Sequence, residues 1–257
     1  MDRGGGELVT SNHTTRLILL AAGFVLVPSL AMAQAKPERV VLGINETYQA
    51  GTSEVSSTVG FTANLEKGTF AYQFPVKQGP AIDVSGRIRL FNNFGLGVAY
   101  TSFSASGTTA ITGQVPHPFF FSQMRSIAGQ ASLDREETAL HVRATFSSSP
   151  GKKLQFTVFG GAAFFTVKQG LVDRVSYTES YPYDTAAFGT ATTHQESLSK
   201  MGFGAGADVA YYFTKNVGIG AVASIAKATI DATASDSSTV SINVGGSSMG
   251  LGLRLRF

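Results

Sequence analysis

Apolar and non-apolar residues alternate along several stretches of the chain, most clearly between residues 201 and 213. There Phe203 and Val209 belong to an apolar odd-numbered row, whereas Gly204 and Asp208 belong to a small or polar even-numbered row. Side chains two residues apart share one face of a β-strand, so this pattern predicts a strand with one apolar face. Eight segments show the pattern: 55–65, 82–90, 94–101, 139–146, 154–164, 201–213, 217–226 and 240–257.

The connections between these segments alternate between short and long. Short turns are predicted near 92–93, 147–153 and 214–216, and longer links near 66–79, 105–136, 169–199 and 232–237. Three turns on one side and four loops on the other are what an eight-stranded antiparallel up-and-down barrel requires. We therefore predict an all-β fold of this type, with both ends of the barrel on its turn side.

The composition favours a membrane-spanning barrel over a soluble β-sandwich, which would also alternate. Charged residues make up 14% of the chain, against ~25% in ordinary soluble domains. The row formed by Gly202, Gly204 and Gly206 is a poor water-exposed strand face, because glycine weakens strands and adds no charge. No window after residue 33 approaches the ~20 apolar residues of a transmembrane helix, which leaves a closed barrel as the spanning structure.

The first residues are predicted to be a leader rather than part of the fold. An apolar stretch at 17–27 precedes Ala31, Met32 and Ala33, the small-residue pattern that signal peptidase cleaves. We expect a signal peptide at 1–33, a short periplasmic segment at 34–53 and the transmembrane barrel at 54–257. The chain has no cysteine, which excludes disulfides, thiolate metal sites and a lipoprotein anchor. The net charge of +3 is too small to imply nucleic-acid binding.

The last eight residues, Gly-Leu-Gly-Leu-Arg-Leu-Arg-Phe, resemble the terminal β-signal of outer-membrane proteins, and residues 202–220 resemble a strand–turn–strand of the small OmpA-like barrels. The resemblance covers a barrel domain without the periplasmic peptidoglycan-binding domain. It implies residence in the cell outer membrane, lipid and lipopolysaccharide as neighbours, and recognition of Leu253, Leu255 and Phe257 by the barrel-assembly machinery. We expect a monomer.

Charged residues gather on the predicted inner face of the strands. An eight-stranded barrel is filled by its own side chains, and buried charges persist when they are paired. We therefore predict a structural cluster in which Asp208 pairs with an arginine from another strand; the alternative is a narrow, anion-preferring conduit for small solutes. The predicted lumen cluster comprises Asp83, Arg87, Arg89, His141, Arg143, Asp208, Arg254 and Arg256.

The last predicted strand changes its pattern midway. Residues 249–257 have apolar odd positions, whereas Val240, Ile242 and Val244 are apolar even positions. A β-bulge near Gly245 and Gly246 would explain such a change of phase.

Catalysis by a lipid-modifying outer-membrane enzyme is the least favoured function. Such an enzyme needs a nucleophile, a histidine and an acid near the lipid-facing rim. His141 is predicted to point inward, and His117 and His194 to lie in loops. We therefore predict a non-enzymatic protein without cofactor or metal.

Two predicted loops are unusually aromatic. Their aromatic side chains would either pack locally or against lipopolysaccharide, or form a contact patch for a surface ligand, since exposed apolar patches often mark binding sites. The expected function is accordingly a structural or surface-interaction barrel. The patch comprises Phe119, Phe120, Phe121, Tyr177, Tyr181 and Tyr183.

Overall fold

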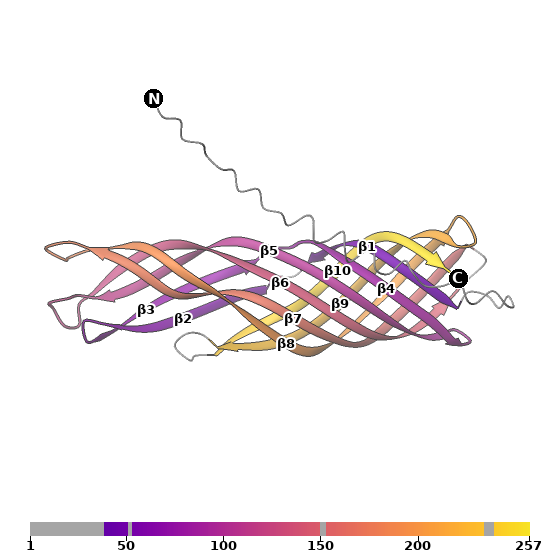
Figure 1. The fold of residues 1–257 in the computed structure, drawn as a ribbon, viewed down its shortest axis with the longest axis horizontal. Helices are drawn as coiled ribbons and strands as arrows, with labels where there is room; N and C mark the ends of the chain where they lie inside the picture. Colours follow the sequence, from indigo (N-terminus) through magenta and orange to yellow (C-terminus); the bar gives the residue numbers. More distant parts are fainter. Residues whose placement is uncertain (1–38, 51–52, 150–152, 234–238) are drawn as a thin grey trace, which may run out of the picture. The chain divides into compact units, whose positions relative to one another are not determined.

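A computed structural model describes residues 39–50, 53–149, 153–233 and 239–257; the predicted leader lies outside these residues. The described chain is built from antiparallel strands (Figure 1). The strands are β1 (Val40–Ala50), β2 (Ser53–Ala63), β3 (Glu66–Val76), β4 (Gly79–Phe91), β5 (Phe94–Pro116), β6 (Met124–Ser148), β7 (Leu154–Glu179), β8 (Ala186–Tyr212), β9 (Val217–Thr233) and β10 (Thr239–Arg256).

Eight of the strands close into a ring in the order β5-β4-β1-β10-β9-β8-β7-β6, with β6 pairing back onto β5. β1 lies between β10 and β4 in the ring. Its residue Val41 pairs with Arg256 on β10 and with Arg87 on β4. The predicted eight-stranded antiparallel up-and-down barrel is confirmed. Because the ring is closed, the N–H and C=O groups of its first and last strands are paired with each other. A sheet surrounded by lipid requires such pairing.

The predicted start of the barrel is wrong. The segment 34–53, expected to precede the barrel, contains the ring strand β1, whereas the predicted first strand 55–65 is mostly β2. β2 pairs with β3, and β3 adds only to the distal part of β5, from Thr69↔Gln114 to Gln73↔Ala110. The alternation of β1 is hidden in the sequence because Glu46 occupies its outward row, between the outward residues Ile44 and Tyr48.

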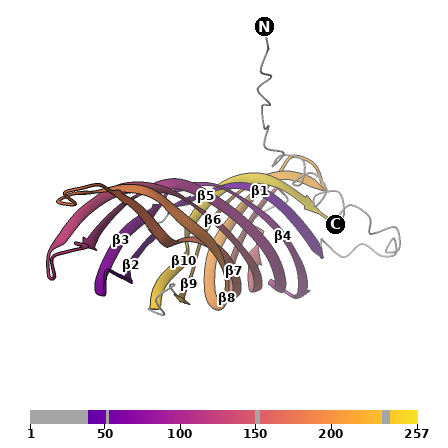
Figure 2. The same ribbon diagram turned by 60° about the vertical axis from the view of Figure 1, so that its left-hand side comes forward.

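The predicted long links are mostly strands. Residues 66–79, 105–136 and 169–199 lie largely within β3, β5, β6, β7 and β8, and the last four of these strands are 23–27 residues long. A bilayer requires only ~9–11 residues per strand, so these hairpins continue far beyond it. Figure 1 shows them extending away from the end at which the C-terminus lies, and Figure 2 shows the same tips from a second direction. The link 232–237 falls mainly on residues outside the described part of the chain.

The outer surface carries an apolar band near the turn end of the ring. Outward side chains of this band are exposed on every ring strand, and include Ile44, Ile88, Leu96, Val142, Val158, Phe203, Ile219 and Leu253. Such a band is typical of barrels that face lipid. Among the described residues, no helix is long and apolar enough to cross a membrane.

The interior has two zones. Near the turns, inward side chains are polar or charged, such as Asp83 and Arg143. In the extended hairpins the interior is an apolar core, to which Val55 of β2, Phe74 of β3 and Leu171 of β7 contribute. The β2–β3 hairpin therefore completes a packed core beyond the membrane-facing band.

The change of pattern in β10 follows from these two zones. Its pairing with β9 runs from Thr239↔Thr233 to Leu255↔Val217 without a shift of register. The side chain of Ile242 is buried in the apolar zone, just as that of Arg254 is buried in the polar zone. The predicted bulge is therefore wrong, because the even positions face inward in both zones. Gly245 and Gly246 do have positive φ, of 84° and 148°, but the ladder continues through them.

Candidate functional site

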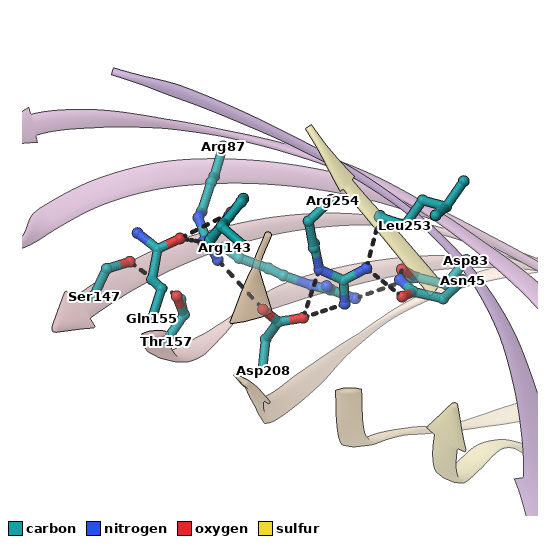
Figure 3. Close-up of polar contacts among 11 residues, drawn as sticks. Asn45, Asp83, Arg87, Arg143, Ser147, Gln155, Thr157, Asp208, Leu253 and Arg254 are labelled. Carbon is teal, nitrogen blue, oxygen red and sulfur yellow. Dashed lines mark hydrogen bonds and ion pairs between the residues drawn. The ribbon is translucent and has the colours of Figure 1, made fainter. Parts of the chain in front are cut away.

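The lumen cluster is centred on Asp208, which projects from β8 toward the closing strand (Figure 3). Arg254 of β10 donates from Nε to Asp208 Oδ2 at 3.0 Å and from Nη2 to the same oxygen. Arg254 Nη1 also donates to Asn45 Oδ1 at 2.6 Å, and Asn45 Nδ2 donates to Asp83 Oδ1 at 2.7 Å. One chain of contacts thus crosses from β8 through β10 and β1 to β4.

Two further arginines complete this cluster. Arg87 lies 3.9 Å from Asp208 Oδ1 and donates to Gln155 Oε1 at 2.7 Å. Arg143 lies 3.8 Å from Asp83 Oδ2, with its guanidinium 4.4 Å from the ring centroid of Phe159. Each guanidinium is therefore compensated by a carboxylate, an amide or an aromatic face, as buried charge requires.

The remaining predicted lumen residues lie at the margins of the cluster. Arg256 donates to Lys215 O at 2.6 Å and stacks on Tyr212 at 3.8 Å. His141 Nε2 lies 3.3 Å from the hydroxyl of Thr101. Arg89 is half-buried and lines the turn end of the lumen. The structure thus places all eight predicted side chains on the inner face.

A second buried ion pair lies farther from the turns. Arg135 Nη2 of β6 donates to Glu137 Oε2 at 2.9 Å and to Asn243 O at 2.8 Å. Glu137 Oε1 in turn accepts from the backbone N–H of Gly245 at 2.7 Å. This pair therefore links β6 across the lumen to β10. The sequence pattern missed Arg135 because that residue fell in a predicted loop.

These contacts leave little open space. The cavity lined by Arg87, Arg143, Asp208 and Arg254 has a volume of about 40 Å³, room for one or two water molecules. Distal to it stand the Arg135–Glu137 pair and the apolar core. The lumen is therefore filled by side chains at successive levels.

The second candidate site lies at the far tips of the hairpins. Large apolar side chains are exposed there on three different turns: Leu65 is 90% exposed, Phe121 74% and Tyr181 86%. Phe119 packs edge-on against Tyr183, with ring centroids 5.3 Å apart, so two of these turns touch. We call the exposed Leu65, Phe119, Phe120, Phe121 and Tyr181, together with the half-buried Tyr183, the distal crown.

The buried side chain of Arg125 cross-links two turns of the distal crown. It donates from Nη1 to Tyr183 O at 3.0 Å and from Nη2 to Pro116 O at 2.8 Å. The same Nη2 lies 2.5 Å from Glu179 Oε2 on β7. A single guanidinium thereby fixes the β7–β8 tip to the β5–β6 tip. Sequence reasoning missed Arg125, because nothing in its neighbourhood along the chain marks it as buried.

The other tips are tied in the same way. Glu66 Oε1 on β3 accepts from the backbone N–H of Ser122 at 2.8 Å. His117 is buried, and its Nδ1 accepts from the backbone N–H groups of both Phe119 and Phe120 at 3.1 Å. The distal crown is therefore a preformed surface rather than three independent loops.

Backbone strain is concentrated in this region. Positive φ angles occur at Asn64, Leu65, Ser122 and Tyr183, all in the distal turns, and at Asn92 in a turn at the opposite end. Non-glycine residues in this conformation cost of order 1–3 kcal/mol each and cluster at functional sites. Strain, exposure and cross-linking thus coincide in the distal crown.

Tyr177, predicted with the patch, is not part of the distal crown. It pairs with Phe188 in the β7–β8 ladder and is half-buried. Burial raises the pKa of its phenol, and the nearby Glu179 carboxylate raises it further.

The remaining predicted residues are dispersed. Leu253, Leu255 and Phe257 face outward on or next to β10, as the lipid-facing row of the closing strand. His194 lies 4.0 Å from Asp173 in an exposed position, in a different zone from the lumenal His141. His117 supports the distal crown. His117, His141 and His194 therefore belong to separate places in the fold.

The closed ring and its outward apolar band define the class of protein: a small β-barrel of the outer membrane. The sequence matches no protein-family model and no curated protein. The fold, however, is similar to solved outer-membrane proteins of the small-barrel type, in agreement with the resemblance to OmpA-like barrels.

Three solved structures illustrate this similarity. The outer membrane protein OprG of Pseudomonas aeruginosa aligns with a TM-score of 0.50 and 6% identity, over 86% of this chain and 97% of its own. Neisserial surface protein A gives 0.42 and 11%, over 85% and 97%. Ail, the attachment invasion locus protein of Yersinia pestis, gives 0.37 and 14%, over 86% and 100%. At these identities the likeness concerns the fold alone.

Proposed function

We propose that this protein is a non-conducting, non-enzymatic outer-membrane barrel that presents the distal crown as a contact surface. The observation that carries the proposal is the Arg125 cross-link, which joins the β5–β6 and β7–β8 tips through Tyr183, Pro116 and Glu179. Holding exposed aromatic side chains in one arrangement before contact lowers the entropy lost on binding.

The height of the distal crown argues against the alternative of packing against the lipids of its own membrane. Along β5, the outward apolar row ends near Tyr100, and the strand continues to Pro116. At about 3.3 Å per residue and a tilt of about 40°, those residues span roughly 40 Å. The crown therefore stands well above the bilayer, where it is available to an external surface.

The filled lumen supports a non-conducting barrel. Its arginine excess would suit an anion conduit, the alternative function, but Arg87 and Arg254 are held by Gln155 and Asp208. Planar-bilayer recording on the refolded protein tests this part of the proposal. We expect no single-channel current; steady single-channel steps would favour the conduit instead.

Adhesion of cells that display the protein tests the contact function. The triple variant Phe119→Ser, Phe120→Ser, Phe121→Ser should reduce retention of such cells on polystyrene and on cultured epithelial cells. A matched control is Lys168→Gln with Glu136→Gln, which removes an exposed ion pair on the hairpin walls. Equal retention of the triple variant and the wild type on both surfaces would contradict the proposal.

A further inference from the structure

We infer that the distal crown inserts into the interfacial layer of an apposed lipid bilayer. This inference rests on the proposed contact function and names its partner as a second, zwitterionic membrane surface. It follows from three properties of the crown: the state of its backbone polar groups, its charge and its shape.

Three backbone N–H groups of the β5–β6 tip are satisfied within the protein. The N–H groups of Phe119 and Phe120 donate to His117 Nδ1, and that of Ser122 donates to Glu66 Oε1. Pro116 O accepts from Arg125. Pairing within the protein avoids the cost of removing these donors from water when the tip enters a less polar layer. A tip built to recognise a peptide or a sugar would keep such donors available for its ligand.

The exposed side chains of the distal crown carry no charge. The nearby carboxylate of Glu179 is paired with Arg125, whereas that of Glu66 accepts from the backbone N–H of Ser122 and keeps its charge. The exposed charges that flank the crown along the chain, Lys67 and Asp184, have opposite signs. A surface with uncharged exposed side chains and no cluster of basic residues complements a zwitterionic bilayer, because an anionic one would attract clustered basic residues.

The shape of the distal crown also favours lipid. Phe119, Phe120 and Phe121 follow one another in a single turn, where their exposed fractions lie between 59% and 74%. A stable protein interface draws on roughly 20–30 residues per partner, many more than the six side chains of the distal crown. Insertion needs no matching pocket, because it depends on the apolar area removed from water. The phenols of Tyr181 and Tyr183 suit the polar boundary of a bilayer, where tyrosine is enriched.

A fluorescence experiment tests the inference directly, because the chain contains no tryptophan. The Phe120→Trp variant is placed in nanodiscs of ordinary phosphatidylcholine and mixed with liposomes of dibrominated phosphatidylcholine. We expect a blue shift and loss of emission as liposomes are added, at low and at high salt. The control is Ser106→Trp, an exposed site on the wall of β5, whose emission should stay unchanged.

The outcomes separate this inference from the function on which it rests. Emission from Phe120→Trp that is unaffected by brominated liposomes would overturn insertion. If the triple serine variant still lost adhesion in that case, the contact function would stand with a protein or glycan partner. Heat-modifiability of each tryptophan variant on unheated gels verifies that the barrel has closed.

Discussion

Arg254 on the closing strand donates from two nitrogen atoms to one carboxylate oxygen of Asp208 on β8, across the barrel interior. Both side chains are buried. The pair therefore ties the last strand of the ring to a strand that is not its ladder partner, and its effect on stability follows from the cost of leaving one charge unpaired.

Replacing Asp208 with asparagine should destabilise the barrel. The change keeps the shape of the side chain but leaves Arg254 and Arg87 without their shared counter-ion. Breaking a buried pair in this way costs about 3–5 kcal/mol. Urea unfolding in lipid, together with the gel shift of unheated samples, measures the loss.

The control for this change is the exposed pair of Lys168 and Glu136, whose atoms lie 3.1 Å apart. Its removal should cost only about 0–1 kcal/mol, because water screens both charges. Equal effects of Asp208→Asn and Lys168→Gln would show that the buried pair makes no special contribution.

Closure of the ring should depend on Gly252. A Cβ added at this position would meet Ile44 O at 1.9 Å and Asn45 Oδ1 at 2.6 Å, so the contact between β10 and β1 would have to open. We expect Gly252→Ala to lower the free energy of unfolding by at least the ~1–3 kcal/mol typical of overpacking. The fraction of folded barrel after refolding is the second measurement.

Gly160 on β7 provides the comparison. A Cβ there would lie 3.7 Å from Gly204 O, an ordinary contact. Gly160→Ala should therefore leave stability unchanged or raise it by up to ~1 kcal/mol. If both alanine variants refolded equally well, close approach of β1 and β10 would not limit closure.

The ring could largely be predicted from the sequence because its outer face has a single environment. Lipid demands an apolar row on each strand, and this row is what the alternation in 201–213 and 217–226 displayed. The prediction failed at β1, where Glu46 interrupts the row. It also failed in β10, where Val244 and Arg254 share the inward face but lie in different interior zones.

The candidate sites were predictable only in part. The lumenal charges could be identified, since their inward direction follows from the parity of each strand. Arg125 and His117 could not, because their roles depend on contacts with Tyr183, Glu179 and the backbone of Phe119, which depend on how three hairpins meet. Water on the outside of these hairpins removes the apolar row that marked the strands nearer the turns.

The distal core should weaken at alkaline pH through Tyr72. Burial raises the pKa of this phenol above its ordinary value of 10.0, despite the hydrogen bond that its oxygen accepts from the Val172 N–H. Because the pKa is raised in the folded state, the stability is fully present below about pH 10 and is lost as the pH rises through the folded value. Subtracting the ultraviolet titration of Tyr72→Phe from that of the wild type isolates the absorbance of this one phenol. We expect it to ionise at a higher pH than N-acetyltyrosinamide in the same detergent. A difference spectrum that follows the free compound would contradict this.

We expect the Leu65 side chain to lower the stability of the β2–β3 turn and to contribute to the contact surface of the distal crown. Asn64 and Leu65 form the β2–β3 turn with φ angles of 50° and 66°, the geometry for which Asn-Gly is the preferred pair. Leu65→Gly should therefore stabilise the hairpin by about 1–2 kcal/mol, the cost of the left-handed conformation. Hydrogen exchange of the β2 and β3 amides should slow accordingly.

The same change should weaken the distal crown, because it removes a side chain that is 90% exposed. Retention of displaying cells should fall while hydrogen exchange slows, a pairing that a purely structural turn would not produce. Leu65→Ala separates the two effects: it removes most of the apolar area but keeps the strained backbone. We therefore expect this variant to lose retention without the gain in protection. If Leu65→Gly slowed exchange and left retention unchanged, the strain at Leu65 would have no connection with contact.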